Sequence, residues 1–296
     1  MPRFGAHMSI AGGLHLAFER IISVKGEALQ VFTRNQRQWA AQELSDEAVE
    51  RFLSSWEKTD RMIVASHANY LANLAATDLE LAEKSVDSIA DELRRAEILR
   101  IPYLVLHPGS RGAQEPREGI KTFTRNLDEA VHRSNSQSVM LLIENTAGQG
   151  SGLGSSFEEI RDIIDNSHFK TRLGVCFDTC HAYAAGFDIK SREGYRKTFQ
   201  HFDRTIGLDR LKFFHINDSK KGLGSRVDRH WHIGKGELGI KGFSHLVNDP
   251  LFRDHPMVLE TPKGKDLAED KVNLAVLRSL VKKRSAPAGK KRRIQE

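Results

Sequence analysis

The chain has 296 residues, of which 39% are hydrophobic and 28% are charged. This is the composition of a globular protein, and no apolar run approaches the ~18 residues that a membrane-spanning helix needs. The N-terminal residues lack the apolar core of a secretion signal, so we expect a cytoplasmic protein without a membrane partner. The length allows two domains of ordinary size or one large barrel or sheet.

The formal net charge of +6 is concentrated at the C-terminal end of the chain. Residues 282–296 contain seven basic side chains and one acidic side chain, which leaves 38 of each sign in residues 1–281. We therefore divide the chain into a folded domain, residues 1–281, and a basic, disordered tail, residues 282–296. Such a tail fits a nucleic-acid partner and equally a solubilising extension.

The two cysteines, Cys176 and Cys180, stand four residues apart. This spacing matches neither a disulfide framework nor the C-x-x-C pairs of a structural zinc site. We expect a reducing compartment and interpret both cysteines as packing residues.

Eight short runs of almost continuously apolar residues recur along the chain. Strands that are buried on both faces of a parallel sheet have this character. The predicted strands are residues 4–8, 28–33, 62–66, 103–106, 139–143, 173–177, 211–216 and 257–259.

Helical patterns separate these runs. Residues 78–99 repeat apolar side chains at close to 3.6-residue spacing, and further helices are predicted to begin after Ser45, Pro116, Ser156 and Ser191. Eight repeats of strand and helix without a composition break predict a single (β/α)8 TIM barrel, with its active site at the C-terminal rim of the strands. An open doubly wound sheet would need G-x-G-x-x-G after its first strand, and this motif is missing there.

Side chains of metal-ligand type follow the predicted strands. Because the C-terminal ends of barrel strands share one rim, these side chains should gather there. Four carboxylates together would repel one another, a cost that divalent cations remove. Imidazole and carboxylate without thiolate favour Zn²⁺, with Mn²⁺ or Fe²⁺ as alternatives, and nine ligands require two or three ions. Besides His7, the nine are His67, His107, Glu144, Asp178, His181, His215, Asp228, His230 and Glu260.

The segments around these residues resemble the endonuclease IV family of apurinic/apyrimidinic endonucleases. The similarity runs in order from about residue 4 to about residue 280. It rests on HANYL at 67–71, LHPG at 106–109, IENTAGQG at 143–150, GVCFDTCH at 174–181, FHINDSK at 214–220, DRH at 228–230 and LETP at 259–262.

The resemblance implies a site with three Zn²⁺ ions, with Mn²⁺ or Fe²⁺ as an alternative at one of them, and with Glu144 and Glu260 as catalytic residues. Glu144 would bridge two ions. The implied ligands are His67, His107 and Glu144 for the first ion, Glu144, Asp178, His215 and Glu260 for the second, and His181, Asp228 and His230 for the third.

The resemblance also selects Arg37, Tyr70 and Leu71 as DNA-contacting residues. An apolar or aromatic wedge can fill the space of an extruded nucleotide, at an unstacking cost that is smallest where no base is present. The alternative for Tyr70 and Leu71 is that they begin the apolar face of a helix.

The implied function is that of a zinc-dependent endonuclease of base-excision repair. It would act as a monomer on double-stranded DNA that contains abasic sites or 3′ blocking groups. It would cut 5′ to an abasic site and leave a 3′-hydroxyl and a 5′-deoxyribose phosphate. Two alternatives remain: a metal-dependent sugar isomerase or epimerase on a related barrel, which needs only one or two ions, and a non-catalytic DNA-binding protein that uses the basic tail.

Overall fold

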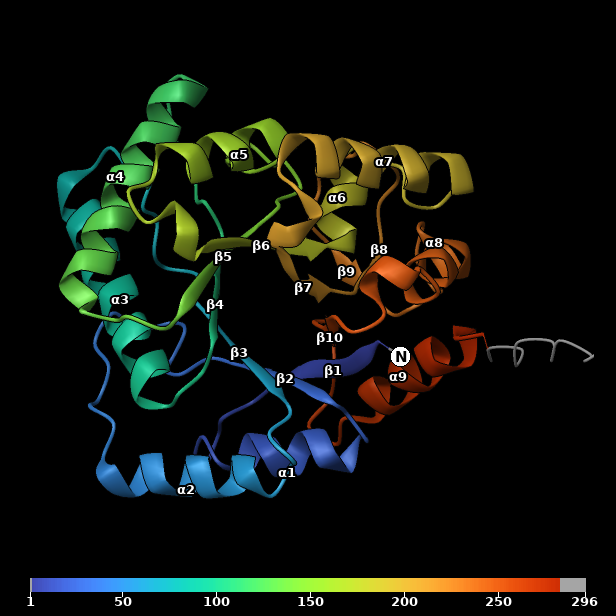
Figure 1. Cartoon of the computed structure of the whole chain (residues 1–296), viewed down its shortest axis with the longest axis horizontal. Coiled ribbons are helices and arrows are strands. Elements are labelled where there is room, and N and C mark those ends of the chain that lie inside the picture. Colours follow the sequence, from blue (N-terminus) through green and yellow to red (C-terminus); the bar gives the residue numbers. More distant parts are fainter. Residues whose placement is uncertain (1, 283–296) are drawn as a thin grey trace, which may run out of the picture.

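Eight parallel strands close into a barrel in the computed structural model, which describes residues 2–282 (Figure 1). Each strand pairs with its neighbour along the chain, and the last strand closes the barrel against the first. The predicted (β/α)8 barrel is thereby confirmed. The strands are β1 (Arg3–Met8), β2 (Ala28–Val31), β3 (Ile63–His67), β4 (Tyr103–Leu106), β5 (Met140–Glu144), β6 (Leu173–Asp178), β7 (Leu211–His215) and β10 (Pro256–Leu259).

A ring of helices surrounds the strands (Figure 1). Two connections depart from a simple strand and helix alternation, because β6 is followed by two helices and β7 by the short antiparallel pair β8 (Asp218–Ser219) and β9 (His230–Trp231). None of the helices within residues 2–282 is both long and apolar enough to cross a membrane. The helices are α1 (Leu16–Ser23), α2 (Asp46–Glu57), α3 (Leu79–Ile98), α4 (Pro116–Ser134), α5 (Phe157–Asn166), α6 (Thr179–Ala185), α7 (Arg192–Thr205), α8 (Gly239–Val247) and α9 (Ala268–Leu280), with single 3-10 turns at Lys170–Arg172, Leu208–Arg210 and Pro250–Phe252.

The helix starts follow the capping signals of the sequence. The side chains of Ser45, Asp78, Ser156 and Ser191 each accept a hydrogen bond from the backbone N–H three residues further along. These bonds satisfy amides that have no partner inside the helix. Pro116 is itself the first residue of α4, where its missing N–H costs nothing.

Two apolar layers hold the barrel. The larger layer packs the helices against the outer faces of the strands. The smaller one fills the barrel interior and includes Cys176, which is fully buried among apolar side chains as expected. The interior below the rim is therefore a packed apolar core.

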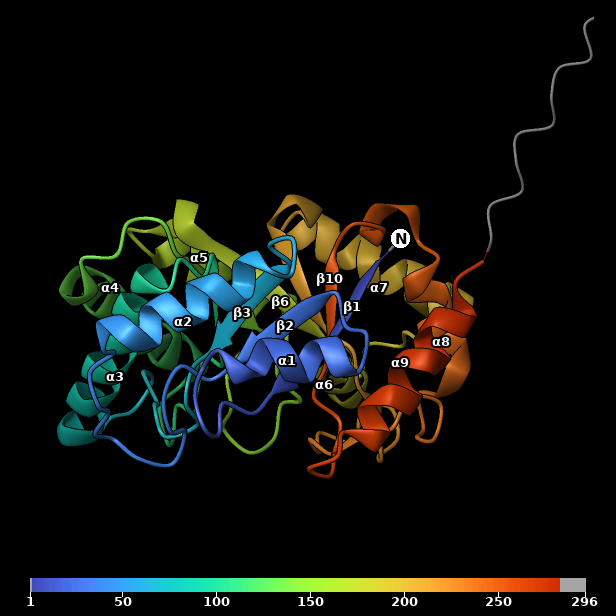
Figure 2. The same ribbon diagram turned by 90° about the horizontal axis from the view of Figure 1, so that it is seen from below.

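The long connections after the strands lie together along one edge of the barrel, the lower edge in the side view of Figure 2. These connections carry the residues predicted to form the site. Of the predicted basic tail, only Lys282 lies within the described residues, so the division of the chain at residue 281 stays a prediction.

Glu97 on α3 anchors the connection between α4 and β5. Its carboxylate accepts hydrogen bonds from the Ser136 hydroxyl, the Gln137 amide, and the amide and hydroxyl of Ser138, at 2.7 to 3.1 Å. Burial alone would raise the pKa of Glu97, but these four bonds lower it to about 2.

Glu97→Gln should therefore lower the free energy of unfolding near neutral pH by about 1 kcal/mol, a value kept small by solvent screening. Because the folded-state pKa lies below the ordinary value, this contribution is present above about pH 4.5 and is lost as the pH falls toward 2. Urea unfolding at several pH values tests it, with Glu118→Gln on the surface of α4 as control. A deficit that does not shrink in acid would contradict the assignment.

Candidate metal centre

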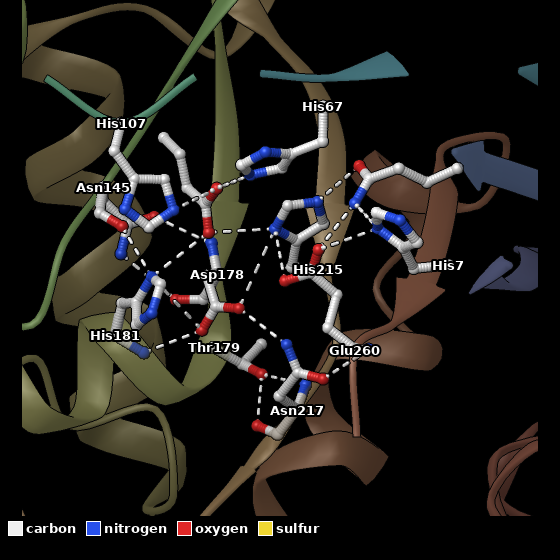
Figure 3. Close-up of polar contacts among 12 residues, drawn as sticks. His7, His67, His107, Asn145, Asp178, Thr179, His181, His215, Asn217 and Glu260 are labelled. Carbon is white, nitrogen blue, oxygen red and sulfur yellow. Dashed lines mark hydrogen bonds and ion pairs between the residues drawn. The ribbon is translucent and has the colours of Figure 1, made fainter. Parts of the chain in front are cut away.

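Nine histidine and carboxylate side chains converge on the C-terminal rim of the barrel. Figure 3 shows part of this group, including His107, Asp178 and His215. His67, Glu144, Asp178 and His215 are the last residues of β3, β5, β6 and β7. All four are buried, and they lie close together because the C-terminal ends of barrel strands are neighbours in space.

Of the four sets of side chains within residues 2–282 that have the spacing of metal ligands, two contain Glu144. In each set, one donor atom per residue lies within 4.8 Å of all the others. Glu144 belongs to both sets: its Oε2 lies 3.1 Å from His107 Nε2, and its Oε1 lies 2.9 Å from His215 Nδ1. These two sets are His67, His107 and Glu144, and Glu144, Asp178, His215 and Glu260.

A third group lies beside these two. Asp228 Oδ2 is 3.2 Å from His181 Nε2, and Asp228 Oδ1 is 3.3 Å from His230 Nε2. The two remaining sets with ligand spacing are Asp178, His181 and His230, and Cys180, Asp228 and His230. Burial raises the pKa of the Cys180 thiol to about 12, whereas imidazole and carboxylate offer donor atoms without the loss of a thiol proton.

Asp218 shapes the loop that carries Asp228 and His230. Its buried carboxylate accepts hydrogen bonds from the backbone amides of Gly234, Gly236 and Leu238, at 2.9 to 3.0 Å. The short β8 and β9 pair then places His230 opposite the residue after Asp218. Two predicted ligands that lie far from the strand ends in the sequence, Asp228 and His230, are thus brought back to the rim.

The electrostatics of the rim fit divalent metal ions. Within residues 2–282, none of the ion pairs joins a lysine or arginine to the carboxylate of Glu144, Asp178, Asp228 or Glu260; their partners are imidazoles. Burial opposes ionisation of Glu144, yet the imidazoles around it hold its pKa well below the usual range. Carboxylates gathered without a lysine or arginine partner are compensated by divalent cations, and imidazole with carboxylate suits zinc.

Several amide side chains that the sequence analysis missed hold these groups in place. Gln30 on β2 donates to Glu260 Oε1 at 2.6 Å and accepts from His215 Nε2 at 2.7 Å. Asn217 donates to Asp178 Oδ2 at 2.7 Å. The sequence did offer a signal for Gln30, because a polar residue inside an apolar strand needs buried hydrogen-bond partners.

His7 also lies at the rim, at the end of β1. Its Nδ1 is 2.9 Å from Gln30 Nε2 and 3.6 Å from Glu260 Oε1, whereas its buried Nε2 has no hydrogen-bond partner within residues 2–282. Burial lowers the pKa of His7 to about 4. In its neutral form, His7 accepts a hydrogen bond from Gln30 Nε2 and so helps to fix the orientation of Gln30.

The residues predicted to contact DNA lie on the same face. Arg37 is exposed in the loop between β2 and α2. Tyr70 and Leu71 form a turn after β3, and α3 begins only at Leu79, so the alternative that they begin a helix face is wrong. Tyr70 is 61% exposed, and its ring lies 5.6 Å from that of His67.

A cavity of about 360 Å³ opens beside this turn. It is lined by His67, Tyr70, Asn73, His107, Gln149 and Asp228, among others. The cavity joins the turn to the first and third groups of ligand-type side chains, so a molecule that enters it would reach both.

The closed parallel barrel and its histidine and carboxylate rim define a xylose isomerase-like TIM barrel, and the sequence profile of that family matches residues 18–280. The chain is 49% identical to probable endonuclease 4 of Chloroflexus aurantiacus over 281 residues, 95% of this chain and 99% of the relative. Endonuclease IV from Thermus thermophilus has a similar crystal structure, with a TM-score of 0.85, 39% identity, and coverage of 94% of this chain and 98% of that one. The chain belongs to the endonuclease IV family of apurinic/apyrimidinic endonucleases.

The barrel itself is shared more widely. A D-tagatose 3-epimerase-like protein has a TM-score of 0.70 at 19% identity, covering 94% of this chain and 98% of that one. That likeness concerns the fold alone, whereas the similarity to the endonucleases extends to the sequence. The resemblance inferred from the motifs is thus confirmed, and the isomerase alternative is not favoured.

Proposed function

We propose that this endonuclease hydrolyses the phosphodiester bond 5′ to an abasic site in double-stranded DNA. The products would be a 3′-hydroxyl and a 5′-deoxyribose phosphate, and the same centre would remove 3′ blocking groups. The observation that carries the proposal is the position of Glu144, whose two oxygens face two separate sets of donors. Relatives of nearly full length that are named endonuclease 4 support it.

The proposed cofactor is a group of three Zn²⁺ ions, with Mn²⁺ or Fe²⁺ as an alternative at one site. Such ions, when bound, lower the pKa of water and neutralise charge on a phosphate and its leaving oxygen. The proposed ligands are His67, His107 and Glu144 for the first ion, Glu144, Asp178, His215 and Glu260 for the second, and His181, Asp228 and His230 for the third.

The proposed role of the protein side chains is to orient the metal ions and the DNA, and none of them is proposed as a covalent nucleophile. Glu144 and Glu260 are the proposed catalytic carboxylates, and Gln30 fixes the orientation of Glu260 through its 2.6 Å hydrogen bond. Arg37, Tyr70 and Leu71 are proposed to contact the duplex. Tyr70 suits this role because its exposed ring stands at the edge of the metal centre, where it can fill the space of an extruded nucleotide.

A duplex with one tetrahydrofuran abasic analogue tests this function. This analogue has no aldehyde, so strand cleavage by elimination cannot occur and only hydrolysis is scored. We expect incision 5′ to the analogue, a 3′ end that a polymerase can extend, loss of activity after metal chelation, and recovery with Zn²⁺. Elemental analysis should find three ions per chain. Undiminished incision after complete metal removal would contradict the proposal.

A further inference from the structure

Helix α3 holds the turn that carries Tyr70 and Leu71 through a buried carboxylate. Glu92 is fully buried, and its Oε1 accepts hydrogen bonds from the backbone N–H of Asn69 at 3.0 Å and from Asn69 Nδ2 at 2.7 Å. The Asn69 side-chain oxygen in turn accepts the backbone N–H of Leu71 at 2.9 Å. Glu92 is therefore connected to the turn by an unbroken chain of hydrogen bonds.

The same turn of α3 also holds the loop that carries Arg37. Arg34 in that loop is buried, and its Nη1 donates to Asp91 Oδ2 at 2.9 Å. Arg95 donates to the same oxygen at 2.8 Å and to the carbonyl of Thr33 at 3.3 Å. Asp91, Glu92 and Arg95 lie within one helical turn, so a single rigid element supports both segments that are proposed to contact DNA.

Burial of the Glu92 carboxylate carries a desolvation cost in free energy. Its Oε2 is buried and has no hydrogen-bond partner within residues 2–282. Burial raises the pKa of Glu92 to about 7, although the two bonds from Asn69 and the charge of Arg34 oppose the shift. An apolar residue of similar volume would avoid this desolvation cost but would leave two buried donors of Asn69 without an acceptor, so the carboxylate at this position serves to hold Asn69.

We propose that Glu92 is a positioning residue for lesion recognition, which holds Tyr70 and Leu71 beside the metal centre through Asn69. The inference rests on the proposed DNA contact of that turn. A turn that is held in its binding geometry before DNA arrives loses less conformational entropy on binding, which strengthens recognition without adding a contact.

Glu92→Leu tests the inference, because leucine keeps most of the volume and removes the acceptor for Asn69. With the metal-loaded enzyme and a duplex that contains a tetrahydrofuran site, KM should rise by about tenfold or more. Hydrolysis of bis(p-nitrophenyl) phosphate and the metal content should stay unchanged. Glu92→Gln retains the carbonyl acceptor and should stay within about threefold of the parent.

A double-variant cycle separates positioning from a general loss of structure. In a Tyr70→Ala/Leu71→Ala background, Glu92→Leu should change KM by less than about twofold, because no wedge remains to be positioned. If Tyr70→Ala/Leu71→Ala alone leaves both KM and turnover on the duplex unchanged, the proposed DNA contact fails. The Glu92 inference fails if Tyr70→Ala/Leu71→Ala weakens recognition but Glu92→Leu has the same KM as the parent. It also fails if Glu92→Leu raises KM by the same factor in the parent and in the Tyr70→Ala/Leu71→Ala background. Should Glu92→Leu not fold, Asn69→Ala decides between these outcomes, because it removes the side-chain bonds that connect Glu92 to Leu71 and keeps only the backbone bond of residue 69.

Discussion

Glu144→Ala is expected to lower the rate of abasic-site incision by about a thousandfold or more, equivalent to about 4 kcal/mol of transition-state stabilisation. Glu144 has one carboxylate oxygen, Oε2, that faces His67 and His107, and its other oxygen, Oε1, faces His215. Its removal should weaken two ion sites at once, since the remaining imidazoles then lack their shared negative partner. Single-turnover kinetics and elemental analysis of the purified variant measure both effects.

Two comparisons sharpen this test. Asp228→Ala removes a carboxylate that lies beside His181 and His230 and belongs to neither set that contains Glu144, so it should cost a single ion and leave the other two bound. Glu118→Ala changes an exposed carboxylate on α4 that pairs with Lys121, and it should leave metal content and rate unaltered. Three bound metals and a near-normal rate in Glu144→Ala would refute the bridging role.

Tyr70→Ala combined with Leu71→Ala is expected to reduce turnover on an abasic site within a duplex by about tenfold or more, because the aromatic stacking alone is worth about 1–3 kcal/mol. The metal ligands are untouched, so metal content and the hydrolysis of bis(p-nitrophenyl) phosphate should hardly change. The ratio of the two activities, corrected for folded protein by circular dichroism, is the quantity to measure.

The structure makes a folding defect a weak explanation for such a loss. Tyr70 is 61% exposed and lies in a turn before α3, so its truncation creates no large cavity in the core. Leu79→Ala, which removes an 84% exposed side chain at the start of α3, is a suitable control for the loss of surface apolar area. An activity ratio equal to that of the parent would exclude a wedge at Tyr70 and Leu71.

The barrel, its helix starts and the kinds of residue at its rim were predictable from the sequence because their signals are local. Strands buried on both faces need continuous apolar runs, and Ser45 or Asp78 satisfies amides only three residues away. Once the barrel was inferred, the order of strands alone placed His67 and Glu144 on one rim, since parallel strands end at the same side.

The arrangement of the rim and its supports was decided by the tertiary structure alone. Gln30 contacts Glu260 across 230 positions of sequence, and Glu92 reaches Asn69 across 23, so neither bond leaves a periodic or spacing signal. The sequence also left Tyr70 open between a residue that begins the apolar face of a helix and a residue that contacts DNA. The structure places Tyr70 in a turn, in which the Asn69 side-chain oxygen accepts hydrogen bonds from the backbone amides of Leu71 and Ala72. Glu92 on α3 in turn holds Asn69.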